Sequence, residues 1–372
     1  MKIGLVRRGY SSSGGAEKYL KRFAQALAAT GHQCVLFTGT EWPTTQWRFG
    51  EMVRVSSRAS ATPRAFADAL AALRPREKCD WLFSLERVWD CDCYRAGDGV
   101  HRAWLERRAR FEKPWRAWTR WLNGKHREMM RLEAQLFSRE AKNRTVIANS
   151  RMVKNEIVRY FDFPAERIAV IYNGLPKNER HEMKPDLQAA MRSAVRRELK
   201  IADEDFVVLF VGSGWERKGL RFAIAAMDAA HRSGPTLLVA GEGKRRGLPD
   251  SNRVRFLGSV QNIPAILAAS DLFLLPTIYD PFSNACLEAL GAGLPVITTS
   301  SNGFSEIIQP GAEGEVLDDP ADIDAIARAI ERWSDPEKRA RIKPRLQALA
   351  AEFSMKANLE ATLALVKSRA DF

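Results

Sequence analysis

The chain has 372 residues, of which 45% are hydrophobic and 28% charged, and this composition indicates a folded protein of more than one domain. No run approaches the roughly 18 apolar residues of a membrane-spanning helix, and the N-terminus turns polar too early for a secretory signal. The five cysteines are scattered, without the paired spacing of a zinc site. We therefore expect a cytoplasmic protein with reduced thiols.

The positive charge lies almost entirely in the first half of the chain. The net charge is +13, and residues 1–172 hold 32 Lys and Arg against 18 Asp and Glu. The remainder holds 26 against 27. This asymmetry indicates that the first half has an anionic partner, which is nucleic acid, an anionic lipid surface or a phosphorylated substrate.

Short apolar runs alternate with helical patterns in the first half. Buried strands are predicted at 3–6, 33–39, 51–57, 80–86, 145–150 and 168–174. The first run is followed by a glycine-containing turn and an amphipathic helix. Strands separated by helices predict a parallel sheet covered on both faces.

The same alternation restarts after a polar segment. A strong strand is predicted at 205–214, followed by a helix at 217–231, and the pattern continues to three helices between Pro320 and Phe372. Two such units predict an α/β fold of two doubly wound, Rossmann-like domains facing across a cleft, with ligands at the carboxyl ends of both sheets.

The expected domain boundaries follow from these patterns. We expect a basic first domain that binds the acceptor, a linker with a lead-in helix, a second domain that binds the donor, and a final helix that crosses back to the first domain. These segments are 1–174, 175–204, 205–350 and 351–372.

The segment VGSGWERKGL (211–220) places glycines after a strand and Arg217 and Lys218 at an expected helix start. Its spacing matches neither the dinucleotide fingerprint nor the Walker loop. Two cations at a helix start oppose the helix dipole, but they suit a phosphate or diphosphate that also accepts backbone N–H bonds. A solvated basic pair is the alternative.

Two further glycine segments carry candidate residues in the first half. In GYSSSGGAEKY (9–19), Gly14 and Gly15 allow close backbone approach to phosphate oxygens, although a plain strand-to-helix turn explains them equally well. In GDGVHRAWLERRARF (97–111), Asp98 and His101 fit a site that positions or deprotonates a hydroxyl group, with a capped loop as the alternative.

Residues 102–144 combine 13 basic and 5 acidic residues with Trp104, Trp115, Trp118 and Trp121. Interleaved Arg and Trp favour a surface that meets anionic lipid headgroups or the acceptor. The alternative is that the Trp residues form a stripe that partly faces the core. Binding of nucleic acid is disfavoured because no recognised nucleic-acid motif accompanies the segment. The Asp-x-Asp triplets within WDCDC (89–93) and at 203–205 match a magnesium spacing, but we interpret both as structural.

The segment YDPFSNACLEALGAGLP (279–295) holds two acids, Asp280 and Glu288, around an expected helix start. Helix starts attract anions, so both carboxylates are candidates for facing a ligand. The alternative is that Asp280 only caps the helix, since Pro281 suits the first helical position.

Together these motifs resemble retaining, GT-B fold glycosyltransferases of family 4. The resemblance rests on the glycine loop, NS at 149–150, YNG at 172–174, RKG at 217–219 and the acid-x7-Glu segment. The run PTIYDPFSNACLEALGAGLPVITTSSNG, with GDGVHRAWL upstream, is similar to the bacterial lipopolysaccharide core glucosyltransferase I branch.

The resemblance implies a role for each matching residue. Glu288 would accept hydrogen bonds from the donor ribose, and Asp280 would bind hydroxyls of the donor sugar. Arg217 and Lys218 would neutralise the diphosphate, which Gly15 would meet from the other domain. Backbone amides of three residues would face the sugar and diphosphate: Phe282, Ser283 and Asn284. Asp98 falls where the related core glucosyltransferases carry an Asp implicated in catalysis, and His101 is close to where other family members place a His. The resemblance thus makes Asp98, His101 and Asp280 the catalytic candidates.

Two positions depart from the usual family pattern. The family usually has Glu where this chain has Asp280, one methylene shorter, although the branch accepts Asp. The phosphate-binding strand end lacks the Arg that many relatives place after the first glycine, and Arg217 would replace it.

The resemblance implies a metal-independent hexosyltransferase that needs no cofactor besides its nucleotide-sugar donor. We expect transfer of glucose from UDP-glucose onto a phosphorylated glycolipid of the lipopolysaccharide inner core, by an enzyme peripheral on the cytoplasmic face of the inner membrane. The alternatives are a GT-B fold nucleotide-sugar epimerase or hydrolase, and a basic nucleic-acid-binding protein.

Overall fold

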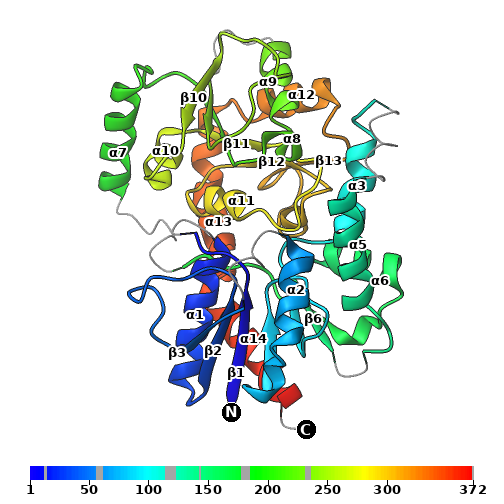
Figure 1. The fold of residues 1–372 in the computed structure, drawn as a ribbon. Coiled ribbons are helices and arrows are strands. Elements are labelled where there is room, and N and C mark those ends of the chain that lie inside the picture. The colour runs from blue at the N-terminus through cyan, green and yellow to red at the C-terminus, as the bar shows by residue number, and fades with distance from the viewer. Residues whose placement is uncertain are drawn as a thin grey trace. The chain divides into compact units, whose positions relative to one another are not determined.

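The computed structural model describes most of the chain, namely residues 1–11, 15–55, 62–113, 123–141, 144–176, 185–230 and 236–370. The chain divides into two compact units, one formed by residues 1–172 with 358–372 and the other by residues 173–357 (Figure 1). Each unit is a parallel sheet with helices, so the predicted pair of doubly wound, Rossmann-like domains is confirmed.

The first unit is built on a seven-stranded sheet of order β3-β2-β1-β4-β5-β6-β7, in which every recorded pairing is parallel. Its strands are β1 Lys2–Arg7, β2 Gln33–Thr38, β3 Gly50–Arg54, β4 Trp81–Ser84, β5 Cys93–Ala96, β6 Thr145–Ala148 and β7 Ile168–Val170. Its helices are α1 Gly15–Ala29, α2 Pro63–Ala72, η1 Pro75–Glu77, α3 His101–Ala109, α5 Gly124–Leu136, α6 Arg151–Phe161 and η2 Ala165–Arg167.

The central strands of this sheet are apolar on both faces because helices or loops cover both. Strand β1 is buried over its four inner residues, and β4 is buried throughout. Gly4 lies where β1 meets its covering residues: a Cβ atom there would approach Cys79 Sγ to 2.6 Å and Leu82 Cδ1 to 2.7 Å. The sequence therefore needs glycine at this point of the core.

The last helix, α14 (Met355–Ala370), is assigned mainly to the first unit. Asn358 Nδ2 donates to the Tyr172 carbonyl at 2.5 Å, and the hydroxyls of Thr362 and Tyr19 lie 3.3 Å apart. Figure 1 shows α14 within the same unit as β1, which is far away in the sequence.

The second unit is built on a six-stranded sheet of order β10-β9-β8-β11-β12-β13, again with parallel pairings. Its strands are β8 Val207–Val211, β9 Thr236–Ala240, β10 Val254–Gly258, β11 Leu272–Leu275, β12 Val296–Thr299 and β13 Gly314–Leu317. Its helices are α7 Pro185–Glu198, α8 Trp215–Lys218, α9 Leu220–Ala229, α10 Ile263–Ala269, α11 Asn284–Gly291, η4 Gly303–Ile307, α12 Ile323–Arg332 and α13 Pro336–Glu352.

Two predictions of local structure were wrong. The mixed segment DCDCYRA was not predicted as a strand, yet its last four residues form the buried strand β5. The helix expected at 217–231 is instead two helices, α8 and α9, separated by Gly219. Gly219 has φ +76°, a left-handed conformation that ends one helix before the next begins.

Candidate functional site

The strand order of each sheet marks where a ligand is expected. In the second unit the chain leaves β8 toward β9 on one side and later adds β11 on the other side. Crevices at such reversals, outside the carboxyl ends of the strands, are the usual ligand sites of open α/β sheets. The segments that follow β8 and β11 are the two that the sequence predicts to bind the donor.

These two segments of the second unit are joined at the backbone. The Arg217 carbonyl accepts hydrogen bonds from the Ile278 amide and the Thr277 hydroxyl, both at 2.9 Å. Gly219 lies so close to the next strand end that a Cβ atom would come within 1.8 Å of the Pro276 oxygen. The turn after β8 is therefore fixed against the loop after β11.

The position expected for Arg217 and Lys218 was wrong in one respect. They are the last two residues of the one-turn helix α8, and Gly219, the N-cap of α9, follows them directly. What sets Lys218 apart is its partner.

Lys218 and Asp280 form an ion pair. The Lys218 ammonium donates to Asp280 Oδ2, and the two side chains are 13% and 6% exposed. The lysine stem runs past Gly212, where a Cβ atom would contact Lys218 Cε at 3.4 Å. The tertiary structure thus brings together the residue predicted to bind the phosphate and the residue predicted to bind the sugar.

Asp280 is not the helix cap. The Ser283 hydroxyl accepts from the Cys286 amide and caps α11, so the capping alternative for Asp280 was wrong. The Asp280 backbone instead pairs with the 301–303 turn, donating to the Ser301 carbonyl and accepting from the Gly303 amide, both at 2.9 Å. Its carboxylate is left to face Lys218.

Asn302 is a site residue that the sequence did not indicate. It is fully buried, and its Oδ1 accepts from the Ser283 amide at 3.2 Å. The Ser283 amide therefore has a partner inside the protein, which argues against the expected donation to a bound sugar. Asn302 Nδ2 donates to Thr298 Oγ1 at 2.9 Å, which fixes the amide orientation.

The remaining residues predicted for the donor lie on or beside α11. Asn284 is exposed at the helix start and accepts from Asn173 Nδ2 at 2.8 Å. Glu288 is half-buried one turn further along the same helix, and Phe282 is buried with its ring centroid 6.1 Å from that of Phe304. The sequence motif therefore forms one continuous structural segment.

The first unit has its own reversal of strand order, between β1 and β4. Arg7, at the end of β1, donates to Glu86 at 2.7 Å and to Glu17 at 3.0 Å. Burial is the main cause that raises the pKa of Glu86, against the nearby charge of Arg7. Gly15 is the first residue of α1, two positions before Glu17, whereas Gly14 lies outside the described residues.

Asp98 projects from a tightly held loop. Its side chain is 76% exposed, while the backbone on either side is fixed by buried groups. Asn149 Nδ2 donates to the Gly97 carbonyl at 3.2 Å, and Arg87 Nη2 donates to the Gly99 carbonyl at 2.7 Å. An exposed carboxylate on a rigid backbone is suited to contact a substrate.

A buried ion pair organises the helix start next to this loop. Arg87 Nε donates to Glu133 Oε1 at 2.9 Å, and the two side chains are 8% and 0% exposed. The same carboxylate oxygen accepts from the His101 amide at 2.6 Å. Glu133, which lies on α5, therefore caps α3 from a distance. Neither Arg87 nor Glu133 was predicted, because their partnership exists only in the folded chain.

His101 is held as a neutral imidazole. Burial, followed by the charges of Arg87 and His126, lowers the pKa of His101 to about 3. Its Nε2 lies 3.0 Å from His126 Nδ1, so one ring donates to the other. At neutral pH His101 can donate or accept a hydrogen bond, but it carries no acidic proton of an imidazolium.

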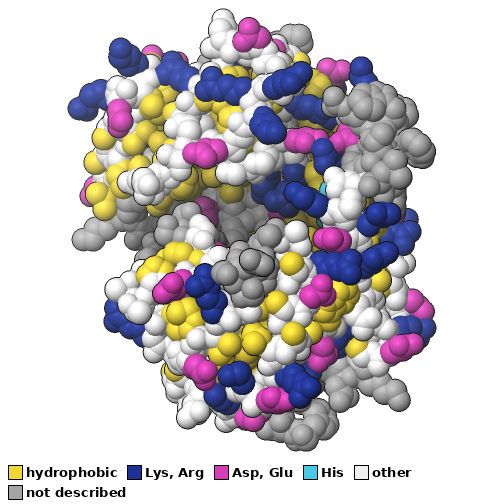
Figure 2. All heavy atoms as spheres, in the orientation of Figure 1, with side chains coloured by type: hydrophobic (Ala, Val, Ile, Leu, Met, Phe, Trp, Pro, Cys, Tyr) yellow, Lys and Arg dark blue, Asp and Glu magenta, His cyan; other side chains and the backbone are white. Residues whose placement is uncertain are grey.

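The basic segment 102–144 is partly neutralised where it is described. Figure 2 shows Lys and Arg side chains on the side of the first unit that carries α3 and α5. Three of the α3 arginines pair with carboxylates: Arg102 with Glu106, Arg107 with Glu156 and Arg108 with Glu112. Trp104 lies beneath the Arg108 guanidinium, 5.6 Å from ring centroid to Cζ, and the three other tryptophans lie outside the described residues.

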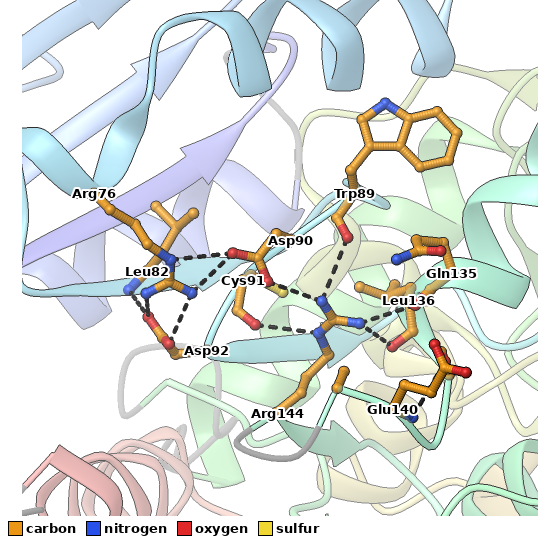
Figure 3. A network of polar contacts seen from close by, with 12 residues as sticks. Arg76, Leu82, Trp89, Asp90, Cys91, Asp92, Gln135, Leu136, Glu140 and Arg144 are labelled. Atoms are coloured by element: carbon orange, nitrogen blue, oxygen red, sulfur yellow. Dashed lines mark hydrogen bonds and ion pairs between the residues drawn. The ribbon is translucent and has the colours of Figure 1, made fainter.

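The two carboxylates of the Asp-x-Asp triplet in the first unit form ion pairs with arginines (Figure 3). Arg76 pairs with Asp90 at 2.9 Å and Asp92 at 3.0 Å, and Arg144 reaches Asp90 at 3.0 Å. Arg144 also donates to the carbonyls of Cys91 and Leu136, which ties the strand start of β5 to the end of α5. Within the described ranges, no group of three or more His, Cys, Asp or Glu side chains is placed to hold a metal ion.

Comparison with known proteins assigns both units. Residues 13–179 match the family model "Glycosyltransferase Family 4", and residues 205–335 match "Glycosyl transferases group 1". The chain belongs to the GT-B glycosyltransferases. The family resemblance and the fold predicted from the sequence are confirmed.

Several curated proteins are similar in sequence to this chain. The lipopolysaccharide core biosynthesis glycosyltransferase LpsE of Rhizobium meliloti is 34% identical over 173 residues, 44% of this chain and 50% of LpsE. The lipopolysaccharide glucosyltransferase WaaG of Escherichia coli is 23% identical over 325 residues, 84% of this chain and 83% of WaaG. The chain spans about half the length of the first curated relatives it matches.

Solved structures agree with the fold. A crystal structure of WaaG matches with a TM-score of 0.80 at 21% identity, over 98% of this chain and 99% of that one. HepE of Anabaena, in complex with UDP-glucose, matches with a TM-score of 0.72 at 19% identity, over 99% of this chain and 100% of that one. In the part of this glycosyltransferase that the structure describes, no helix is long and apolar enough to cross a membrane.

Proposed function

We propose that the enzyme transfers glucose from UDP-glucose, with retention of configuration, onto a phosphorylated glycolipid of the lipopolysaccharide inner core. The names of WaaG and LpsE support the lipopolysaccharide core as context, and the complex of HepE with UDP-glucose supports the donor class. The observation that carries the proposal is the Lys218–Asp280 pair at the strand reversal of the second unit.

The pair places a cation and an anion where a nucleotide sugar needs both. In the proposed complex Lys218 and Arg217 neutralise the diphosphate, and Asp280 accepts hydrogen bonds from the sugar hydroxyls. Glu288 accepts from the ribose hydroxyls, and the amides near Phe282 and Asn284 contribute at the sugar. Fixed cations of this kind stabilise a leaving diphosphate without a metal.

The proposed reaction breaks the bond between the anomeric carbon and the diphosphate oxygen, and forms one between that carbon and the acceptor oxygen. The acceptor attacks from the face that the diphosphate leaves, and its proton passes to the departing phosphate. Negative charge on that phosphate grows during the step, so Lys218 stabilises the transition state more than the ground state. The reaction needs no enzyme nucleophile.

Asp98 and His101 act on the acceptor side in this proposal. The exposed Asp98 carboxylate accepts a hydrogen bond from the acceptor, or steadies positive charge at the reacting carbon. His101 orients its neighbours as a neutral hydrogen-bonding group, because its lowered pKa excludes an imidazolium at neutral pH. The basic first domain holds the phosphorylated acceptor at the cytoplasmic face of the inner membrane.

A thermal-shift panel of nucleotide sugars on the wild type and Glu288→Ala tests the donor half. We expect UDP-glucose to raise the melting temperature of the wild type and the variant to lose most of this rise. Stabilisation by another nucleotide sugar, with none by UDP-glucose, would refute the donor assignment.

Release of UDP from UDP-glucose in the presence of core glycolipid tests the acceptor half. We expect release to depend on acceptor and to fall in Asp98→Asn, whose exposed site leaves the fold intact. Turnover of the donor that is independent of acceptor would instead identify an epimerase or a hydrolase.

A further inference from the structure

The second unit contains a cavity that the proposed reaction does not use. Its volume is about 510 Å³, and it lies among α7, α10 and α13, next to the residues that precede β11 and β12. These are the amino ends of the two strands, whereas the donor segments follow the carboxyl ends of β8 and β11. The cavity therefore lies at the amino ends of the strands, opposite the ends that carry the proposed donor site.

One wall of the cavity carries more cations than its buried carboxylate can balance. Asp271, 8% exposed, accepts from Arg192 and Arg196 at 2.7 Å each and from the Val207 amide at 2.8 Å. Arg339 approaches the same carboxylate to 3.7 Å. Three guanidinium groups thus converge on the Asp271 carboxylate, while Asp203 acts on Arg196 and Asp335 on Arg339 from further away.

Lys343 adds a further cation at the other end of the cavity. Its ammonium donates to Gln188 Oε1 at 2.8 Å, a neutral acceptor, and no ion pair with a described carboxylate is formed. Its stem is held against Gly293, where a Cβ atom would come within 2.5 Å of Lys343 Cγ. Burial, followed by the charge of Arg192, lowers the pKa of Lys343, as expected for cations crowded together.

The acidic residues of the wall lie at the Arg196 end. Arg196 Nη1 donates to the carbonyls of Asp203 and Asp205, at 3.0 Å each, and the Asp205 carboxylate accepts from the Ala202 amide. Glu204 belongs to the same turn. The lining therefore presents cations from α7 and α13 and carboxylates from the 203–205 turn.

We propose that this cavity binds a small hydroxylated organic phosphate, such as a sugar phosphate. The phosphate lies between Lys343 and the guanidinium groups of Arg192 and Arg339, which supply charge-assisted hydrogen bonds. The hydroxyl groups donate to the carboxylates of the 203–205 turn. The ligand relieves the repulsion among the cations, and the site is separate from the donor site.

The test is thermal stability of the full chain titrated with glucose 6-phosphate, inorganic phosphate or glucose, at constant ionic strength. Saturating UDP is present to occupy the proposed donor site. The variant Lys343→Met removes the charge but keeps the stem, and Arg341→Met, an exposed position on the same helix, is the matched control. Circular dichroism checks that both variants fold.

We expect glucose 6-phosphate to raise the melting temperature of the wild type and Arg341→Met at lower concentration than inorganic phosphate does, and glucose to have no effect. Lys343→Met is expected to weaken the response at least about tenfold, as for loss of one charge-assisted contact. Equal responses in Lys343→Met and the wild type, or no response to either phosphate, would overturn the proposal. A missing response to UDP alone would count against the donor assignment and not against this cavity.

Discussion

Lys218 and Asp280, 62 positions apart in the sequence, form a largely buried ion pair at the strand reversal of the second unit. A charge pair in such surroundings loses hydration, and its geometry is maintained by the backbone contacts of both segments. The pair holds the lysine in place before a donor arrives. A bound diphosphate would compete with Asp280 for the same ammonium group.

This competition gives a prediction for Asp280→Asn. Transfer is expected to fall by about 10- to 100-fold, because a charged hydrogen bond to the sugar is lost. Affinity for UDP, which lacks the sugar, should be unchanged or higher, since Lys218 no longer has an anionic partner. Calorimetric titration with UDP and an initial-rate assay with UDP-glucose measure the two effects. If UDP affinity fell together with the transfer rate, the predicted separation of the two effects would be contradicted. The control is Asp324→Asn, on the exposed start of α12.

Gly219→Ala should damage the donor segment through packing. Gly219 has φ +76° and a Cβ atom would lie 1.8 Å from the Pro276 oxygen, so the turn after β8 must move away from the loop after β11. Gly311→Ala is a matched control, because Gly311 has φ +81° with no atom within 4 Å of its added Cβ. The strained backbone costs about 1–3 kcal/mol at either position. We expect only Gly219→Ala to lower affinity for UDP-glucose as well, and equal affinities in the two variants would argue against the contact.

Glu133→Gln should destabilise the loop that carries Asp98. The substitution leaves the buried Arg87 with only the exposed Asp98 carboxylate, 3.8 Å away, as a counter-charge. Breaking a buried ion pair typically costs about 3–5 kcal/mol. Hydrogen exchange at residues 97–103 should accelerate, and the melting temperature should fall. Replacing both partners, Arg87→Met with Glu133→Met, should recover part of the melting temperature but not the protection of the His101 amide, whose acceptor is gone. If residues 97–103 of Glu133→Gln were as protected from hydrogen exchange as in the wild type, the role of Glu133 as a cap would be contradicted.

His101 predicts a defined dependence of stability on pH. Burial and the neighbouring charges lower the pKa of His101 to about 3 in the folded protein, against 6.5 for an ordinary imidazole. Between these values the unfolded chain binds a proton that the folded chain does not, so stability increases as the pH rises through this window. His101→Gln should flatten this part of the profile of melting temperature against pH. If NMR instead shows the His101 ring titrating near neutral pH, the burial argument fails.

The sequence by itself determined the elements and the fold family. Apolar runs of strand length separated by helical patterns predict parallel sheets, since both faces of such a sheet are buried and the strands read as continuous apolar segments. The residues from Asp280 to Glu288 form one local segment, so their spacing was visible without a structure. Strand β5 was missed because its buried residues include Arg95, whose charge masks an apolar pattern.

Only the tertiary structure decided which side chains work together. Three contacts join residues far apart along the chain: the pairing of Lys218 with Asp280, the cap that Glu133 places on α3, and the hydrogen bond from the Ser283 amide to Asn302 Oδ1. Local propensity carries no signal for such contacts, because each depends on the order in which strands are placed in a sheet. The division of Arg217 and Lys218 from the following helix likewise depends on the close approach of Gly219 to Pro276, which exists only once β8 and β11 are adjacent.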